Sequence, residues 1–476
     1  MANCNWKGLQ VPARMSSRLP LALFRCSRTL SPLLRPRLAF SMSSQSPAAG
    51  TEPEIPHFEF AEEPLGLPAS EGFGYFQGRP GLVFGPDKRF KLQTKLGFGT
   101  TSSVWLARDS IRDTHVAIKI LSGFATSLNR ERKLRELEVL QRLSSPKDSS
   151  DPSSRCVRLL DHFYYPGIEE DGEHLCLVTE LFWSNVQAFQ DADTEFIPIT
   201  SLKRMLRHLL LGIAHSHERG IAHTVHPLPD IKPDNIMIEL GPFWTTEAID
   251  KWLAENPPRT YPPERSLNKM VSVLISHFFP PPTLDQIQFC NFKLADFSSD
   301  DVKLFHPATN TVAAQIVSDQ TTDDITPLGL RAPEVVLGGE WNESVDIWTF
   351  GCMVFTLLTK VPLFEPMVAE EYNASEVDVL LYQMILFCGE FFQPDLLRRC
   401  SRSIDYFERD CSPRKFTSFP RKTFEECILS TGRPLSPEDM AGVTDLMTRC
   451  LRLDPKNRAT AQELLTHPWL AQTKST

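Results

Sequence analysis

Two short stretches of the chain combine acidic, basic and amide side chains at a spacing that suits phosphate chemistry. The first reads Asp230-Ile-Lys-Pro-Asp-Asn235, and the second reads Ala295-Asp-Phe-Ser298 after an apolar run over 292–294. The carboxylate of Asp230 could accept a hydroxyl proton, and Lys232 could neutralise a transferred phosphoryl group. Asn235 and Asp296 carry the oxygen ligands that Mg²⁺ prefers. The spacing therefore predicts metal-assisted phosphoryl transfer, with Asp230 and Lys232 catalytic and with Asn235 and Asp296 as metal ligands.

A glycine-containing segment earlier in the chain lies between two β-like runs. Glycines let a hairpin backbone approach phosphates without a Cβ clash, although the same spacing also occurs in ordinary β-turns. A strand-like run follows, which excludes a dinucleotide-binding loop, and no G-x-x-x-x-G-K is present, which excludes the P-loop nucleotide hydrolases. The residues predicted to contact a nucleotide in this segment are Leu96, Gly97, Phe98, Gly99, Thr100, Thr101, Ser102, Ser103 and Val104.

Lys119 closes the apolar run Val116-Ala-Ile-Lys119, fifteen residues after the glycine-containing segment. A lone lysine on a strand usually faces solvent, but one in an apolar run after such a segment can hold α- and β-phosphates. It then needs a carboxylate to orient it. Glu136, in the helical pattern over Leu128–Leu143, is the best candidate, and Glu131 and Glu138 are alternatives expected on a solvated face.

Three further motifs follow in a fixed order. Arg331-Ala-Pro-Glu334 precedes Asp346-Ile-Trp-Thr-Phe-Gly351, and Arg458 ends Leu453-Asp-Pro-Lys-Asn-Arg458. We expect a buried ion pair between Glu334 and Arg458, which would fix the segment around Glu334 to the helical part of the chain. All these motifs occur in a consistent order and spacing, and together they support phosphoryl transfer far more strongly than any one of them alone.

The elements that must position these residues change character along the chain. A mostly β first part is followed by a mostly helical second part, which predicts an α+β fold of two lobes with a cleft between them. A helix is predicted over 199–217 from apolar residues at three- and four-residue steps, and the proline-rich stretch 241–290 reads as an insertion. The β-like runs are Phe90–Lys95, Ser103–Ala107, His115–Ile120, Val157–His162 and Leu175–Glu180.

On these motifs the sequence resembles the eukaryotic protein kinases over roughly residues 86–472. The run from Leu96 to Asp109, the sequence His223-Thr224 before the Asp-Ile-Lys-Pro-Asp-Asn motif and the insertion after Asn235 are similar to the serine/arginine-rich-protein-specific kinases, especially the fungal ones. The resemblance implies a β-rich N-lobe over about 86–180, a helical C-lobe over about 183–472, and ATP bound between them.

The resemblance also implies how the adenine is held. The backbone of Glu180 and Phe182 would bind it, past Thr179 at the gatekeeper position, and the ring would lie between Val104, Ala117 and Met237. Because Thr224 stands where most protein kinases have arginine, the resemblance further implies constitutive activity rather than control by phosphorylation of the activation loop.

Four positions depart from the pattern of the family. Ser102 and Ser298 replace glycines, and Pro327 stands where many serine/threonine kinases have threonine. Most seriously, Val225–Pro229 adds five residues with two prolines between Thr224 and Asp230. The leading interpretation is an ATP- and Mg²⁺-dependent serine/threonine protein kinase, and the alternative is a catalytically impaired pseudokinase that acts as a binding scaffold.

Composition and charge limit the partners. The chain has 476 residues with a net charge of −9, yet residues 1–51 hold seven basic and no acidic side chains. The remaining 43 basic and 59 acidic residues leave a net charge of −16, which argues against direct nucleic-acid binding and is compatible with an Arg/Ser-rich protein substrate. No apolar run is long enough to span a bilayer. We expect an intracellular protein, because the eleven scattered cysteines form no C-x-x-C pair. We also expect a monomer.

The first 51 residues alternate arginine with leucine, phenylalanine, serine and alanine. This composition is typical of a mitochondrial transit peptide, with a simple tail or a later start codon as the alternatives. Without import, the resemblance favours cytoplasm and nucleus. Residues 52–85 are rich in proline, glycine and glutamate and predict a linker before the catalytic domain.

Overall fold

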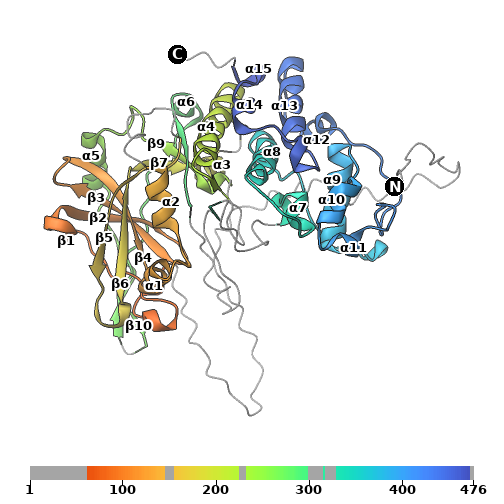
Figure 1. Cartoon of the computed structure of the whole chain (residues 1–476). Helices are drawn as coiled ribbons and strands as arrows, with labels where there is room; N and C mark the ends of the chain where they lie inside the picture. Colours follow the sequence, from red (N-terminus) through yellow and green to blue (C-terminus); the bar gives the residue numbers. More distant parts are fainter. Residues whose placement is uncertain are drawn as a thin grey trace, which may run out of the picture.

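The computed structural model describes residues 62–144, 155–193, 195–223, 232–267, 269–297, 315–316 and 328–471. Figure 1 shows a sheet-rich lobe joined to a helical lobe. The sheet-rich N-lobe comes from the earlier part of the chain and the helical C-lobe from the later part, as the change of periodicity predicts.

One antiparallel sheet of six strands forms the N-lobe, in the order β1-β2-β3-β4-β6-β5. Apolar side chains lie on both of its faces. Phe90, Trp105 and Ile118 belong to the core of one face, and Leu106 and Leu121 belong to the core shared with the helices. The strands are β1 (Val83–Phe84), β2 (Phe90–Phe98), β3 (Ser102–Asp109), β4 (Thr114–Leu121), β5 (Leu159–Pro166) and β6 (Glu173–Thr179).

The single helical pattern predicted over Leu128–Leu143 is two helices in the structure. Helix α1 (Gly123–Arg130) ends where Arg132 adopts a left-handed backbone with φ of 59°, and α2 (Glu136–Leu143) begins after the turn. The amides of residues 133 and 134 both donate to the carbonyl oxygen of Leu128, which closes this turn. No glycine or proline marks the break, so the apolar spacing alone could not reveal it. The consequence is that Glu136 lies in the first turn of a new helix.

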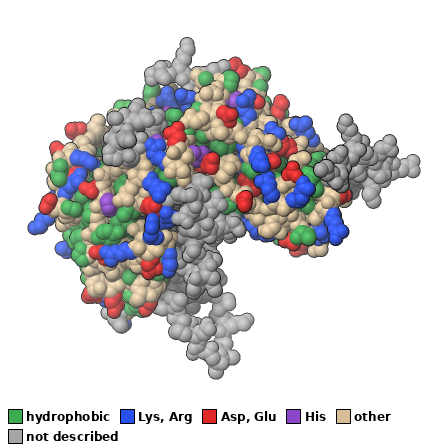
Figure 2. All heavy atoms as spheres, viewed as in Figure 1, with side chains coloured by type: hydrophobic (Ala, Val, Ile, Leu, Met, Phe, Trp, Pro, Cys, Tyr) green, Lys and Arg blue, Asp and Glu red, His purple; other side chains and the backbone are tan. Residues whose placement is uncertain are grey.

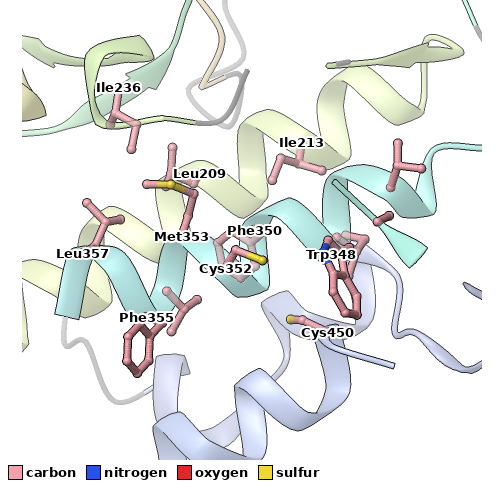
Figure 3. Close-up of a cluster of buried hydrophobic side chains, with 14 of the residues drawn as sticks. Leu209, Ile213, Ile236, Trp348, Phe350, Cys352, Met353, Phe355, Leu357 and Cys450 are labelled. Atoms are coloured by element: carbon pink, nitrogen blue, oxygen red, sulfur yellow. The ribbon is translucent and has the colours of Figure 1, made fainter. Parts of the chain in front are cut away.

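Helix α4 (Ile199–His217) crosses the C-lobe and packs against α8 (Ser344–Thr359). Figure 3 shows Leu209 and Ile213 of α4 beside Phe350 and Met353 of α8, with Cys450 of α13 (Pro437–Cys450) approaching from the other side. All of these side chains are at most 1% exposed. Full burial of a leucine, isoleucine, phenylalanine or methionine side chain contributes about 1.5–3 kcal/mol, so this contact stabilises the lobe.

Shorter elements complete the C-lobe. A three-stranded sheet in the order β12-β9-β7 lies beside the connection to the N-lobe, and β8 pairs with β13. These strands are β7 (Phe182–Asn185), β8 (Ile221–Ala222), β9 (Ile236–Glu239), β12 (Phe292–Leu294) and β13 (Gln315–Ile316). The helices are α3 (Val186–Ala192), α7 (Pro333–Val336), α9 (Glu376–Cys388), α10 (Pro394–Arg399), α11 (Ser403–Tyr406), α12 (Phe424–Ser430), α13 (Pro437–Cys450), α14 (Ala461–Leu465) and α15 (Pro468–Ala471).

The predicted insertion 241–290 leaves the C-lobe after β9 and packs along the N-lobe before it returns to β12. It contains α5 (Thr246–Glu255), β10 (Glu264–Ser266), β11 (Lys269–Val271) and α6 (Leu284–Ile287). Asp250 of α5 lies 3.0 Å from the ring of His115 on β4, and Trp183 of β7 donates to the carbonyl of Pro280 at 2.6 Å. The insertion therefore contacts both lobes.

Residues 62–85 belong to the stretch for which the sequence predicts a linker, but they are packed on the N-lobe. Leu65, Leu67, Tyr75, Phe76 and Phe84 are each at most 6% exposed, and β1 is the edge strand of the main sheet. Glycines, proline and polar residues interrupt these apolar side chains, so the segment has no periodicity that would indicate packing.

Among the described residues, no helix is long and apolar enough to cross a membrane. Figure 2 shows basic and acidic side chains interspersed over the face in view.

Candidate active site

Lys119 on β4 lies close to carboxylates from both lobes. Its Nζ atom lies 2.8 Å from Glu136 Oε1 and 3.7 Å from Asp296 Oδ1. Glu136 comes from the N-lobe helix α2 and is 4% exposed, whereas Asp296 follows strand β12 of the C-lobe. The structure thus brings together three of the predicted site residues from three separate elements.

The two alternative carboxylates are engaged elsewhere. Glu138 binds Arg135 at 3.0 Å and Arg142 at 3.0 Å, and the hydrogen bonds from Arg135 are the largest cause that lowers the pKa of Glu138, to about 2. Glu131 lies 2.7 Å from Lys133. The split of the helical pattern explains the difference, because it turns Glu136 toward the sheet and leaves Glu131 in the turn.

The nine predicted loop residues, 96–104, occupy the end of β2, a tight turn and the start of β3. The amide of Gly99 donates to the carbonyl of Ser102 at 2.8 Å, and Gly97 pairs with Val104 across the hairpin. Ser102, which replaces a glycine of the family pattern, continues β3 and pairs with Leu121 of β4. Extended backbone accepts any residue, so this departure leaves the hairpin intact.

Glu180 and Phe182, predicted to hold the adenine, lie where β6 of the N-lobe connects to β7 of the C-lobe. The carboxylate of Glu180 binds Lys293 Nζ at 2.6 and 2.8 Å and accepts from the amide of Arg158 at 3.0 Å. Since its side chain is held by these groups, Glu180 can reach an adenine only through its backbone, which is the contact that the resemblance implies.

The three residues predicted to enclose the adenine lie in the two sheets on either side of this connection. Val104 is paired with Lys119 in the N-lobe sheet, and Ala117 is paired with Thr179 at the gatekeeper position. Met237 lies on β9, the central strand of the small C-lobe sheet.

Asn235 and Asp296, the predicted metal ligands, are joined through the backbone. The amide of Ala295 donates to the carbonyl of Asn235 at 2.9 Å, and the amide of Asn235 donates to the carbonyl of Lys232 at 2.9 Å. An amide and a carboxylate side chain on adjacent strand ends form an oxygen donor set that fits Mg²⁺, with phosphates able to supply further ligands. Lys232 Nζ is 3.9 Å from Asp234 Oδ2, and burial raises the pKa of Asp234.

The backbone of Asp296 is left-handed, with φ of 58°. A non-glycine residue is strained in this region, and such strain is concentrated at functional sites. The next residue, Phe297, is fully buried and packs on the ring of His223 at 4.5 Å between centroids. The amide of His223 donates to Asp346 Oδ2 at 2.7 Å, and the ring Nε2 of His223 lies 3.1 Å from the carbonyl oxygen of Ala295. His223, which follows β8, therefore ties this part of the chain to the residues that follow β12.

Glu334 and Arg458 form the ion pair expected from the sequence. Two hydrogen bonds of 2.7 and 2.6 Å join the guanidinium to the carboxylate, and Glu334 is fully buried. The guanidinium also donates to the carbonyl of Ser344 at 3.1 Å and lies over the ring of Trp348. These bonds fix α7 to the helices of the C-lobe.

Asp230, the predicted catalytic base, lies outside the described residues, as do Thr224, Val225–Pro229, Ser298 and Pro327.

Sequence reasoning did not find Lys293, which holds Glu180, or Tyr75, whose hydroxyl contacts the glycine-containing loop. Neither belongs to a recognisable motif. For Lys293, the only available signal is its place in the alternating pattern Phe292-Lys-Leu294, which ends two residues before Asp296.

The comparisons with known proteins agree with this geometry. The chain matches the protein kinase domain family over residues 90–243 and 290–470, so it belongs to that family. The unmatched stretch between these ranges lies within the predicted insertion. The family match and the names of its relatives together define an ATP-dependent protein kinase of the serine/threonine class.

The curated relatives span most of the chain, and three of them serve as examples. It is 26% identical to the serine/threonine-protein kinase SRPK of Physarum polycephalum, over 84% of this chain and 89% of the relative. It is 25% identical to the protein kinase dsk1 of Schizosaccharomyces pombe, over 81% of each chain. It is 23% identical to the serine/threonine-protein kinase SKY1 of Saccharomyces cerevisiae, over 81% of this chain and 75% of the relative. The pseudokinase alternative gains no support from these names.

Proposed function

We propose that this kinase binds Mg²⁺-ATP between its lobes and transfers the γ-phosphoryl group to serine or threonine of an Arg/Ser-rich protein. The observation that carries the proposal is the contact of Lys119 with both Glu136 and Asp296, because it places a phosphate-binding ammonium beside a metal-binding carboxylate. Asn235 and Asp296 would hold Mg²⁺. When bound, the metal neutralises charge on the phosphates.

In the proposed reaction, the hydroxyl oxygen of the substrate forms a bond to the γ-phosphorus while the bond from that phosphorus to the bridging oxygen of ADP breaks. Asp230 accepts the hydroxyl proton. Lys119 holds the α- and β-phosphates, oriented by Glu136, and Lys232 balances charge on the transferred group. Such catalysis depends chiefly on positioning and electrostatic stabilisation.

The preference for an Arg/Ser-rich substrate rests on two observations. The relatives include a kinase named SRPK, and residues 52–476 carry a net charge of −16. A polyanionic body attracts an arginine-rich segment more strongly than a neutral one, and ionic strength weakens this attraction.

The substrate proposal is tested with a peptide of alternating arginine and serine and a matched peptide in which glutamine replaces each arginine. We expect kcat/KM to be about fivefold higher for the arginine peptide at low salt, with the ratio falling as salt is added. Equal values for both peptides at every salt concentration would contradict the substrate class while leaving the kinase activity in place. We also propose that the protein is a monomer, and light scattering of the same protein tests this.

We further propose that residues 1–51 direct mitochondrial import, on the basis of their seven basic and no acidic side chains. A fluorescent protein fused to residues 1–51 should enter mitochondria, and the fusion with its six arginines replaced by glutamine should stay diffuse. Cytosolic or nuclear signal from the unaltered fusion would support the alternative of a simple tail.

A further inference from the structure

The hydroxyl of Tyr75 lies against the tip of the glycine-containing loop. Its oxygen is 3.0 Å from the carbonyl oxygen of Gly99 and also contacts the carbonyl oxygen of Thr100. A single O–H donor is thus shared between two neighbouring carbonyls. Tyr75 is 4% exposed, whereas the side chain of Thr100 at the loop tip faces solvent.

The ring of Tyr75 packs against residues outside the glycine-containing loop. It belongs to a small core with Leu65 of the same segment and Val271 and Val273 of the insertion. The backbone on its N-terminal side is fixed as well, because the amide of Gly123 donates to the carbonyl of Gly74 at 2.7 Å. Gly74 has φ of +80°, and a Cβ added there would lie 2.3 Å from the carbonyl oxygen of Asp171. Only glycine fits this approach, so Tyr75 reaches the loop from a well-anchored position.

The base of the same hairpin is supported by the insertion. The amide of His277 donates to the carbonyl of Lys95 at 2.9 Å, and the ring of Phe278 lies 3.3 Å from where a Cβ on Gly97 would be. The side chain of Lys95 is fully buried between Glu62 at 3.0 Å and Glu63 at 2.5 Å. Residues 62–63, the insertion and β2 are therefore held together at the base, while Tyr75 acts at the tip.

The Tyr75 contact also determines which way the loop backbone faces. In a planar trans peptide the carbonyl and the following amide point in opposite directions. Because the Gly99 carbonyl points toward Tyr75, the amide of Thr100 points away from it. An amide so directed is a donor available to a phosphate oxygen on the other side of the hairpin.

We propose that Tyr75 is a positioning residue, which holds the tip of the glycine-containing loop so that the amide of Thr100 faces the phosphates of ATP. The inference rests on the proposed nucleotide site and deepens it, because it assigns part of the affinity for phosphates to a segment that precedes the kinase domain match.

The test compares full-length wild type with Tyr75→Phe, which removes the hydroxyl and keeps the ring. Tyr165→Phe is the matched control, since that ring packs on Phe76 and Phe84 in the same lobe. Calorimetry with Mg²⁺-ATP should show a Kd about threefold to tenfold higher for Tyr75→Phe, the effect of losing one neutral hydrogen bond. The Kd for adenosine, which has no phosphates, should change less than about twofold in both variants.

A second measurement does not depend on nucleotide binding. Hydrogen exchange of the amides of residues 97–103 should be faster in Tyr75→Phe than in wild type or Tyr165→Phe, without ligand and at equal melting temperature. Unchanged exchange in this loop, or equal weakening of ATP and adenosine binding, would overturn the role of Tyr75. Failure of the wild type to bind Mg²⁺-ATP would instead contradict the proposed function, and the exchange data would still decide the role of Tyr75.

Discussion

Lys119→Met and Asp296→Ala should each lower kcat/KM for an Arg/Ser-rich peptide by at least about 100-fold with Mg²⁺-ATP, because each removes stabilisation of the phosphoryl charge. The two side chains lie 3.7 Å apart at the junction of the lobes, and Glu136 binds the same ammonium at 2.8 Å. Methionine preserves the length of the lysine side chain while removing its charge. The expected loss is therefore in chemistry and not in packing.

The control is Lys91→Met on strand β2, where the side chain is exposed. It changes the net charge by the same amount as Lys119→Met and should keep activity within about twofold of wild type. Melting temperatures of all variants show whether the fold is retained. Turnover near wild type in either Lys119→Met or Asp296→Ala would contradict the site assignment.

The parts of the fold that were predictable are those with local chemical or periodic signals. The helix over 199–217 follows from apolar residues at three- and four-residue steps, and its bounds agree with α4. The pairing of Glu334 with Arg458, residues far apart in sequence, followed from a resemblance to known motifs and not from periodicity. Order and spacing of short motifs thus supply the long-range information that a single sequence, taken without an alignment, otherwise lacks.

The parts that were not predictable depend on tertiary contacts without local signals. The turn at Arg132 breaks a continuous apolar pattern with a left-handed arginine, a conformation that sequence propensity disfavours. The segment containing Tyr75 was interpreted as linker because glycines and prolines surround its apolar side chains. Its burial depends on the insertion, whose Val271 and Val273 complete the small core around Tyr75. The segment around Tyr75 and the insertion bury these side chains against each other, so neither sequence by itself indicates packing.

Removing Val225–Pro229 should raise kcat by at least about tenfold, because Pro227 and Pro229 fix φ and remove two amide donors close to Asp230. The excision joins Thr224 to Asp230 and restores His-Thr-Asp-Ile-Lys-Pro-Asp-Asn without interruption. The structure anchors described residues on either side of this stretch, His223 and Asn235, to Ala295. His223 Nε2 lies 3.1 Å from the carbonyl oxygen of Ala295, and the amide of Ala295 donates to the carbonyl of Asn235 at 2.9 Å.

His223 and Asn235 are both anchored at Ala295, and in the sequence the five added residues directly precede Asp230, the predicted base. The Kd for Mg²⁺-ATP should change less than about twofold, since the adenine and the Lys119 contacts lie on other elements. The double variant Pro227→Ala/Pro229→Ala keeps the length but restores two amide donors, so its kcat separates the effect of proline from that of loop length. Equal kcat values in the wild type, the deletion and the double variant would show that the five residues leave Asp230 in place. No activity in any of the three, with ATP binding retained, would favour the pseudokinase alternative, because a chain that binds nucleotide through Lys119 and Asp296 yet cannot transfer phosphate lacks a correctly placed base.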